Sequence, residues 1–329
     1  MDDLDYLFST AKIRAMEGSL LTKQRLNELI GAKKLEDAQH VLDELGWEDP
    51  DFSSYDAMDK TIGNERHRIF KELGSFAPDK RLINVFQLKY DYHNLKAILK
   101  AKAQDKEFSG ILSTSGRITP QQMTAMLNEE NYSAMSPAMR KATEEASEVL
   151  SRTGDPLFAD IALDRACYDE MIQMAKASES EFLRKYIALK IDSINLLAAV
   201  RIKKRGLPYE YLRQSFISGG SVDITKLLTE LSPDTLESAF ATSELLPAAQ
   251  VGGQVLRDEV RLAALDSACD DCLMNFLKTA KYIGLGEQPL VGYAAAKEAE
   301  LMAVRIVFSG KLAGIEPEAI KERLRESYV

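Results

Sequence analysis

Histidines, cysteines and carboxylates are the side chains through which this chain could do chemistry. Its three histidines, His40, His67 and His93, form no metal-binding pair at helical spacing. The sequence therefore has few of the residues that metal-assisted hydrolysis or a histidine-based triad would need. Cys269 and Cys272 are separated by two aspartates. A redox motif would need a preceding strand, and a zinc site would need a second pair of ligands. We therefore expect no metal site and two ordinary helical cysteines.

Glycine-rich sequences that could hold phosphate are incomplete. Gly284-Leu285-Gly286 and Gly252-Gly253 lack the third glycine of a dinucleotide motif or the lysine and hydroxyl residue of a phosphate loop. We expect neither direct nucleotide binding nor a cofactor. The net charge of −9 repels nucleic-acid phosphates, so no nucleic-acid partner is expected.

The polar side chains of most interest recur in three copies of one motif. In each copy an acid is followed three residues later by an amide or an alanine, and eight residues after that by a lysine. The residues at these positions are Asp91, Asn94 and Lys102; Asp192, Asn195 and Lys203; and Glu300, Ala303 and Lys311. The lysines recur at close to one third of the 329-residue chain, which indicates three copies of one structural unit.

The beginning of each unit is marked as well. Leu21-Thr22, Ile118-Thr119 and Val222-Asp223 each place a helix-capping side chain after an apolar residue, and apolar residues at helical spacing follow. In the second copy Pro120 and Gln122 complete a capping-box pattern. We expect a helix to begin at each of these pairs.

Almost every periodic segment has the spacing of a helix. Apolar side chains in residues 88–99 and 187–198 recur every three to four residues without an internal proline or glycine, whereas the alternation typical of strands is nearly absent. The sequence predicts an all-α protein of three similar helical bundles, over residues 1–106, 107–206 and 207–329. Each bundle is large enough to have its own core.

Two interpretations of the repeated polar residues remain open. They could brace each bundle through hydrogen bonds between its helices, or they could line a cavity that receives a partner. Bracing is the expectation for the acids and amides, and Lys203 belongs to a basic cluster that complements the negative end of a helix dipole. The acids and amides are Asp91, Asn94, Asp192, Asn195 and Glu300.

The remaining features of the sequence concern location. No apolar run approaches the roughly 18 residues needed to span a bilayer, and residues 1–5 lack the basic and then apolar start of a secretory signal. Three cysteines are too few for a disulfide scaffold, which fits a reducing compartment. We expect a soluble chain in the cytoplasm.

Three parts of the sequence together resemble a known family. They are the stretch from Ala11 to Thr22, the triplicated Asp/Glu-x-x-Asn-Leu segment with its lysine, and the stretch from Lys297 to Val329. The set resembles the C subunit of the bacterial and archaeal V-type or A-type ATPases, whose eukaryotic counterpart is the d subunit, and it covers the whole chain. One departure is Ala303, where the other copies have an asparagine, and it predicts somewhat different packing in the third bundle.

The resemblance implies a funnel of three helical bundles around a pseudo-threefold axis. It also implies a non-catalytic socket in the central stalk, which joins the rotor shaft, formed by the D and F subunits, to the membrane rotor ring of proteolipid subunits. Such a protein would couple ATP hydrolysis or synthesis to proton or sodium transport without catalytic residues or a cofactor of its own. It would be monomeric in isolation and peripheral, at the cytoplasmic face of the membrane.

Two other classes of protein are alternatives. A helical-repeat adaptor for soluble partners usually has repeats of about 30 to 50 residues, which are shorter than the units here. An all-α enzyme would need acids such as Asp91 or Glu300 with strongly perturbed pKa values and no pairing partner. Gentle detergent extraction separates these classes, because only a socket should copurify with the rotor ring and the head subunits.

Overall fold

The computed structural model describes residues 2–104 and 111–329, and every regular element in these ranges is a helix. The prediction of an all-α protein is therefore confirmed. The first predicted boundary, at residue 106, lies outside the described residues. Both predicted boundaries and the three-bundle funnel stay predictions.

The three longest helices of the described ranges are α5, α9 and α14, and they carry the three copies of the repeated motif. We call them the closing helices. The α-helices are α1 (Leu7–Met16), α2 (Lys23–Gly31), α3 (Leu35–Glu44), α4 (Tyr55–Phe76), α5 (Arg81–Gln104), α6 (Pro120–Glu129), α7 (Pro137–Thr153), α8 (Pro156–Ala177), α9 (Glu181–Lys204), α10 (Tyr209–Ser215), α11 (Pro233–Ala239), α12 (Leu246–Leu256), α13 (Leu262–Lys278), α14 (Gln288–Leu312) and α15 (Pro317–Lys321). Short 3-10 helices are η1 (Asp3–Tyr6), η2 (Glu17–Ser19), η4 (Ile224–Leu228) and η5 (Thr279–Tyr282).

Two of the three predicted helix starts begin α-helices. The Thr22 hydroxyl accepts a hydrogen bond from the Arg25 N–H at the start of α2, and Thr119 forms the predicted capping box at the start of α6. At the third start, Asp223 accepts from both the hydroxyl and the N–H of Thr225, which holds the Asp223 pKa below its ordinary value. This tight turn leads into the 3-10 helix η4 instead of an α-helix.

The helices form two compact units. Unit 1 consists of Met1–Ile83 and Asp270–Val329, and unit 2 consists of Asn84–Cys269. The chain passes between the units within α5 and α13.

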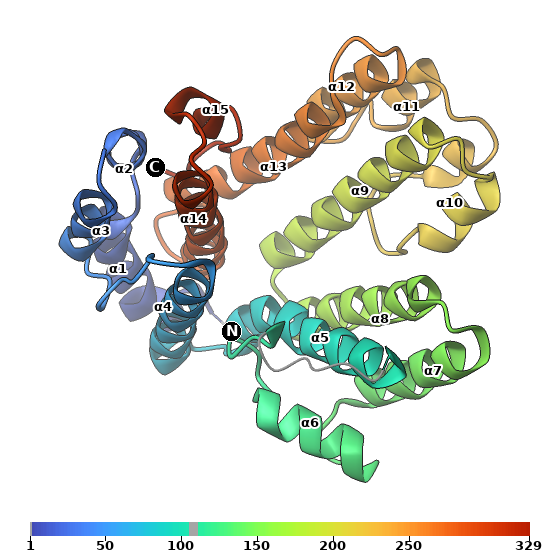
Figure 1. The fold of residues 1–329 in the computed structure, drawn as a ribbon, viewed down its shortest axis with the longest axis horizontal. Coiled ribbons are helices and arrows are strands. Elements are labelled where there is room, and N and C mark those ends of the chain that lie inside the picture. The colour runs from blue at the N-terminus through green and yellow to red at the C-terminus, as the bar shows by residue number, and fades with distance from the viewer. Residues whose placement is uncertain (1, 105–110) are drawn as a thin grey trace. The chain divides into compact units, whose positions relative to one another are not determined.

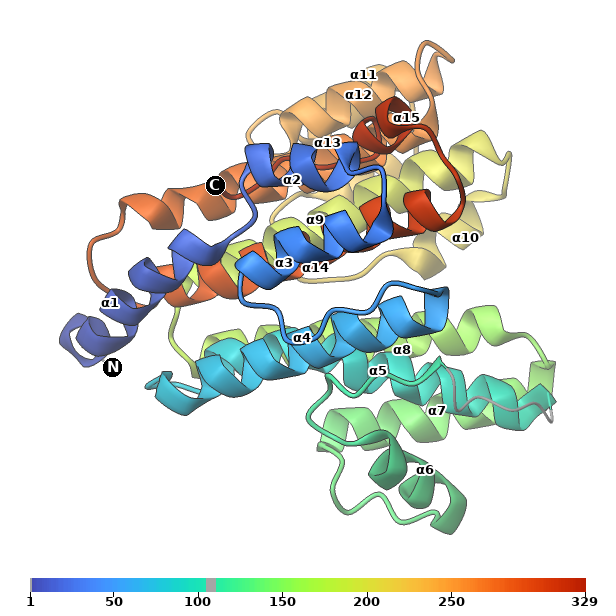
Figure 2. The same ribbon diagram turned by 60° about the vertical axis from the view of Figure 1, so that its left-hand side comes forward.

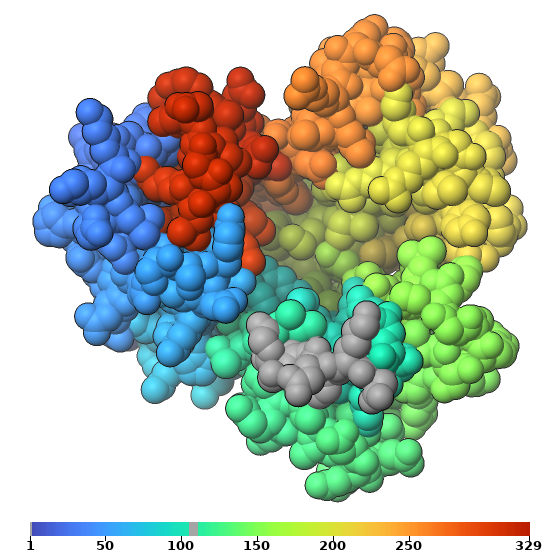
Figure 3. Space-filling model, viewed as in Figure 1, coloured from blue at the N-terminus to red at the C-terminus, as the bar shows by residue number. Residues whose placement is uncertain are grey.

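In unit 1 the two ends of the chain share one hydrophobic core. Helix α4 packs along α14 (Figure 2), and α2 packs against both α3 and α15. The ring of Phe52 stacks on that of Phe308 with 3.6 Å between centroids, and Leu29 and Trp47 are buried in the same cluster. Figure 3 shows the blue N-terminal residues and the red C-terminal residues packed together. The N-terminal helices therefore depend on α14, far along the sequence, for their core.

In unit 2 the helices follow one another as neighbours. Helix α7 packs along α8, α8 contacts α9, and α9 contacts both α10 and α12 (Figure 1). Lys96 on α5 pairs with Asp164 on α8, and the ring of Phe86 on α5 lies 6.0 Å from that of Tyr186 on α9. All of α9 and α5 from Asn84 onward thus lie in one unit, where their motif residues meet the segments that follow them.

Candidate functional site

Asp91 on α5 is a buried carboxylate that binds the segment directly before α6. Its Oδ1 accepts a hydrogen bond from the Ile118 backbone N–H at 3.0 Å, and its Oδ2 accepts from Arg117 Nε at 2.8 Å. Arg117 also pairs with Glu170 at 3.2 Å, and the Tyr92 hydroxyl donates to the same glutamate. Burial raises the pKa of Asp91, while the backbone N–H and Arg117 act in the opposite direction by stabilising the ionised form.

Asp192 on α9 makes the corresponding contact without a cation. Its Oδ2 accepts from the N–H and the hydroxyl of Ser221 at 2.8 and 2.6 Å, and its Oδ1 accepts from the Val222 N–H at 3.2 Å. In the described part of the chain its partners are therefore two backbone groups and one hydroxyl. Burial raises the pKa of Asp192, and these hydrogen bonds offset part of that shift.

Glu300 on α14 makes the third contact of this kind, in unit 1. Its Oε2 accepts from the Leu21 backbone N–H at 2.7 Å, and its Oε1 accepts from Lys297 Nζ at 2.6 Å. Lys297 is only 2% exposed, so the ion pair is taken out of water. Here the neutralising cation comes from the closing helix itself.

The two motif asparagines pair with the backbone through both ends of their amide. Asn94 donates to the Ser113 carbonyl at 2.8 Å and accepts from the Ser113 N–H at 2.7 Å. Asn195 does the same with Ile217, at 2.8 and 2.9 Å. An amide suits this position because it carries a donor and an acceptor side by side. Ala303 cannot make this contact, and it packs against the core of unit 1 instead.

One rule relates the three acids. Each accepts the backbone N–H of the residue directly before a predicted helix start, and we call these residues the opening residues. They are Leu21, Ile118 and Val222. The closing helices α5 and α9 are thus each bonded to the opening residue that comes next in the sequence, and α14 is bonded to Leu21 near the start of the chain. The sequence contained both the motif acids and the helix starts, but it did not show that they contact each other in the folded chain.

Two of the motif lysines cap helix ends. Lys102 donates to the Leu127 carbonyl in α6 at 2.8 Å, and Lys311 donates to the carbonyls of Ile30 and Ala32 at the end of α2, at 3.0 and 2.6 Å. Carbonyls in the last turn of a helix lack intrahelical partners, and a cation there also complements the helix dipole. Burial lowers the pKa of Lys311.

Lys203 differs from the other two motif lysines. Its ammonium group lies 5.8 Å from the centroid of the Tyr209 ring, at the start of α10. The segment that would be equivalent to α2 and α6 is the short 3-10 helix η4.

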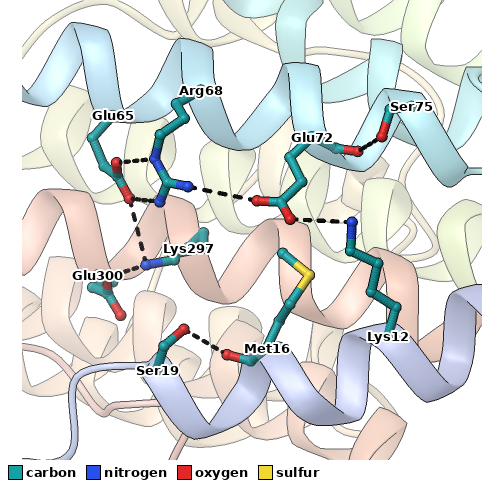
Figure 4. Close-up of polar contacts among 9 residues, drawn as sticks. All are labelled: Lys12, Met16, Ser19, Glu65, Arg68, Glu72, Ser75, Lys297 and Glu300. Atoms are coloured by element: carbon teal, nitrogen blue, oxygen red, sulfur yellow. Dashed lines mark hydrogen bonds and ion pairs between the residues drawn. The ribbon is translucent and has the colours of Figure 1, made fainter. Parts of the chain in front are cut away.

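An ionic network in unit 1, buried at Glu65, Lys297 and Glu300, joins α1, α4 and α14 (Figure 4). Glu65 accepts two hydrogen bonds from Arg68, at 2.7 and 2.8 Å, and lies 3.8 Å from Lys297. Arg68 continues to Glu72 at 3.6 Å, and Glu72 pairs with Lys12 at 3.2 Å. With Glu300 the network holds three acids and three bases, so its formal charge is balanced. Sequence reasoning missed it, although Glu65, Arg68 and Glu72 share one face of α4 at helical spacing.

The cysteine pair, the possible metal ligands and the basic cluster of α9 were the other candidates for a chemical role. Cys269 and Cys272 are buried on α13, and neither forms a disulfide bond. No cluster of three or more histidine, cysteine or acidic side chains suited to a metal ion occurs within residues 2–104 and 111–329. In the basic cluster at the end of α9, Arg201 pairs with Asp266 and Lys204 pairs with Asp258.

None of the helices in the described ranges has the length and apolar character needed to cross a bilayer.

Fold and site together define an all-α protein in which the three copies of one sequence motif bind distant segments through buried polar contacts. The chain belongs to the ATP synthase (C/AC39) subunit family, whose model matches residues 9–323. It is 27% identical to the A-type ATP synthase C subunit of Desulfurococcus sp. (strain SY), over 96% of this chain and 90% of that protein. It is 26% identical to the A-type ATP synthase C subunit of Thermococcus kodakarensis, over 98% of this chain and 90% of that protein. The V-type sodium ATPase C subunit of Enterococcus hirae is 22% identical, over 96% of this chain and 97% of that protein. The resemblance seen in the sequence is therefore confirmed, and the chain is a subunit of the rotary ATPase class.

Proposed function

We propose that this chain is the central-stalk subunit that joins the rotor shaft, formed by the D and F subunits, to the membrane ring of proteolipid subunits. The observation that carries the proposal is the family match over residues 9–323, with relatives named as the C subunits of A-type and V-type enzymes. In this role the chain performs no catalysis. It is monomeric in isolation, lies at the cytoplasmic face of the membrane as a peripheral subunit, and passes rotation between shaft and ring.

A part that transmits rotation must resist deformation, and the motif residues support this role. Asp91, Asn94, Asp192, Asn195 and Glu300 are buried, and each is hydrogen bonded to backbone groups of a segment distant in sequence. Polar groups satisfied in this way have little bonding capacity left for a partner. We propose that they brace the repeats, and that the shaft contacts other side chains.

An exposed apolar face in unit 1 suits the ring. Leu4, Leu7 and Phe8, on η1 and α1, are 67%, 62% and 68% exposed. Exposed apolar residues gathered in this way mark interaction sites more often than single ones do. Three aspartates lie among residues 2–5, and their charge disfavours an anionic lipid surface, so we assign the face to a protein partner.

Tyr282 is a further exposed side chain, on a second segment that contacts α1. Arg14 on α1 donates to the carbonyls of Ala280 and Ile283, at 2.8 and 2.7 Å, and so holds the intervening turn beside α1. Tyr282 within this turn is 88% exposed. We define the apolar face as Leu4, Leu7 and Phe8.

Binding of the purified chain to the isolated ring and to the isolated D–F shaft tests the proposal. The double variant Leu4→Ser/Leu7→Ser should weaken ring binding by roughly tenfold or more, because apolar area would no longer be buried, and should leave shaft binding unchanged. Leu157→Ser is the matched control, since Leu157 is an exposed leucine in unit 2. Failure of the wild-type chain to bind either partner would contradict the proposed function. Unchanged ring binding by the double variant would contradict only the assignment of the face.

A further inference from the structure

Glycines lie beside two of the three buried acids. Gly116 precedes the opening residue Ile118 by two positions, and Gly220 precedes Val222 by two positions. A Cβ atom built on Gly116 would lie 2.3 Å from Asp91 Oδ1, and one built on Gly220 would lie 2.0 Å from Asp192 Oδ1. Non-bonded atoms do not approach this closely. Any side chain at these positions would therefore push the carboxylate away from the N–H groups that it accepts.

The first repeat has a different pair at the same positions. Ser19 precedes the opening residue Leu21 by two positions, and the acid that reaches Leu21 is Glu300. Glutamate is one methylene longer than aspartate, which adds a reach of about 1.5 Å from one more carbon–carbon bond. With the longer acid, the backbone of residues 19–21 can lie further from α14 and still be bonded to it. This leaves room for a side chain at Ser19, whose hydroxyl donates to the Met16 carbonyl.

We propose that Gly116 and Gly220 are positioning residues for the contact between a motif acid and its opening residue, which we call the joint between repeats. The joint has two forms: an aspartate with a glycine, and a glutamate with a serine. In the Asp–Gly form the missing Cβ lets a short acid reach the backbone N–H of the opening residue. In the Glu–Ser form a longer acid makes the same bond across a wider gap. The joint fixes where each repeat begins on the preceding closing helix, and its test does not depend on the proposed function because it uses the isolated chain.

A double-mutant cycle tests the close contact at the Asp192 joint. Gly220→Ala should lower the melting temperature and speed hydrogen exchange of the Val222 N–H by roughly tenfold or more, because the methyl group displaces the carboxylate. In the Asp192→Ala background the carboxylate is absent, so the same glycine change should add little. Gly18→Ala is the control, since a Cβ there meets nothing within 4 Å. Equal effects of Gly220→Ala in both backgrounds, or an effect as small as that of Gly18→Ala, would overturn the proposal.

An exchange of joint forms gives a test that ordinary loss of stability cannot imitate. Asp192→Glu/Gly220→Ser copies the Glu300 and Ser19 pair into unit 2 and should protect the Val222 N–H better than Gly220→Ser alone. If Gly220→Ala does not fold, this comparison still tests the proposal, because the exchanged pair is then expected to restore folding. An exchanged pair that is no better than Gly220→Ser alone would show that the joint does not depend on matching the acid to the gap.

Discussion

Replacing Lys297 by methionine should be among the most costly single changes in unit 1. Its ammonium group lies 2.6 Å from Glu300 and 3.8 Å from Glu65, and all three side chains are almost completely removed from water. Methionine keeps the approximate length of the side chain and removes the charge. Glu65 would retain Arg68, but Glu300 would keep only the Leu21 N–H and become a buried charge without a cation.

The size of the effect follows from that loss. Removing one partner of a buried ion pair costs about 3–5 kcal/mol, because the remaining charge stays desolvated. This is a large part of the roughly 5–15 kcal/mol by which most domains are stable. Urea unfolding monitored by circular dichroism should show the loss as a lower midpoint for the variant than for the wild-type chain.

Two further variants make the measurement decisive. Lys321 pairs with Glu318 at 3.1 Å, also three residues apart, but both side chains are well exposed, so Lys321→Met should cost less than about 1 kcal/mol. In Lys297→Met/Glu300→Gln the stranded charge is gone, and much of the stability should return. If Lys297→Met costs no more than Lys321→Met, the buried network does not hold α14 in the way we infer.

Two predictions concern unit 2. Because burial raises the folded-state pKa of Asp192 above its ordinary value of 3.8, folding favours the protonated form, and this carboxyl should lower stability as pH rises from about 4 through the folded-state pKa. Asp192→Asn removes that titration. In thermal melts at a series of pH values, the stability of the wild-type chain relative to the variant should therefore fall between pH 4 and pH 7. An increase in this relative stability would contradict a raised pKa of Asp192. Asn195→Ala should cost about 1–3 kcal/mol for each Ile217 backbone group left unpaired, whereas Asn131→Ala, at an exposed turn, should cost little; equal melting temperatures would contradict the bracing role.

The sequence predicted the helical architecture well because helix signals are local. The Thr119 capping box needs only neighbouring residues, and it formed as expected. The start at Asp223 shows the limit of such signals, since the same cap type led into a 3-10 helix when the side chain bonded two residues ahead. Cap chemistry identifies where a helix begins more reliably than which kind of helix follows.

The pairing between acids and opening residues could not be predicted in the same way. Asp91 and Ile118 are 27 residues apart and Glu300 and Leu21 are 279 apart, so their contacts depend on how whole helices pack. The substitution of alanine for asparagine at position 303 did indicate a difference in the third copy. The contacts of Lys297 with Glu300 and Glu65 could not be predicted, because Lys297 and Glu65 have no counterpart in the repeated motif.

Coupled transport in a reconstituted complex tests the central claim most directly. ATP hydrolysis and ion transport would be measured on membranes that contain the assembled enzyme, with this chain present, removed and added back. We expect removal to leave hydrolysis by the soluble head in place while ion transport stops, and we expect added chain to restore transport. Ion transport that continues in the complete absence of the chain would contradict its role as the link between shaft and ring.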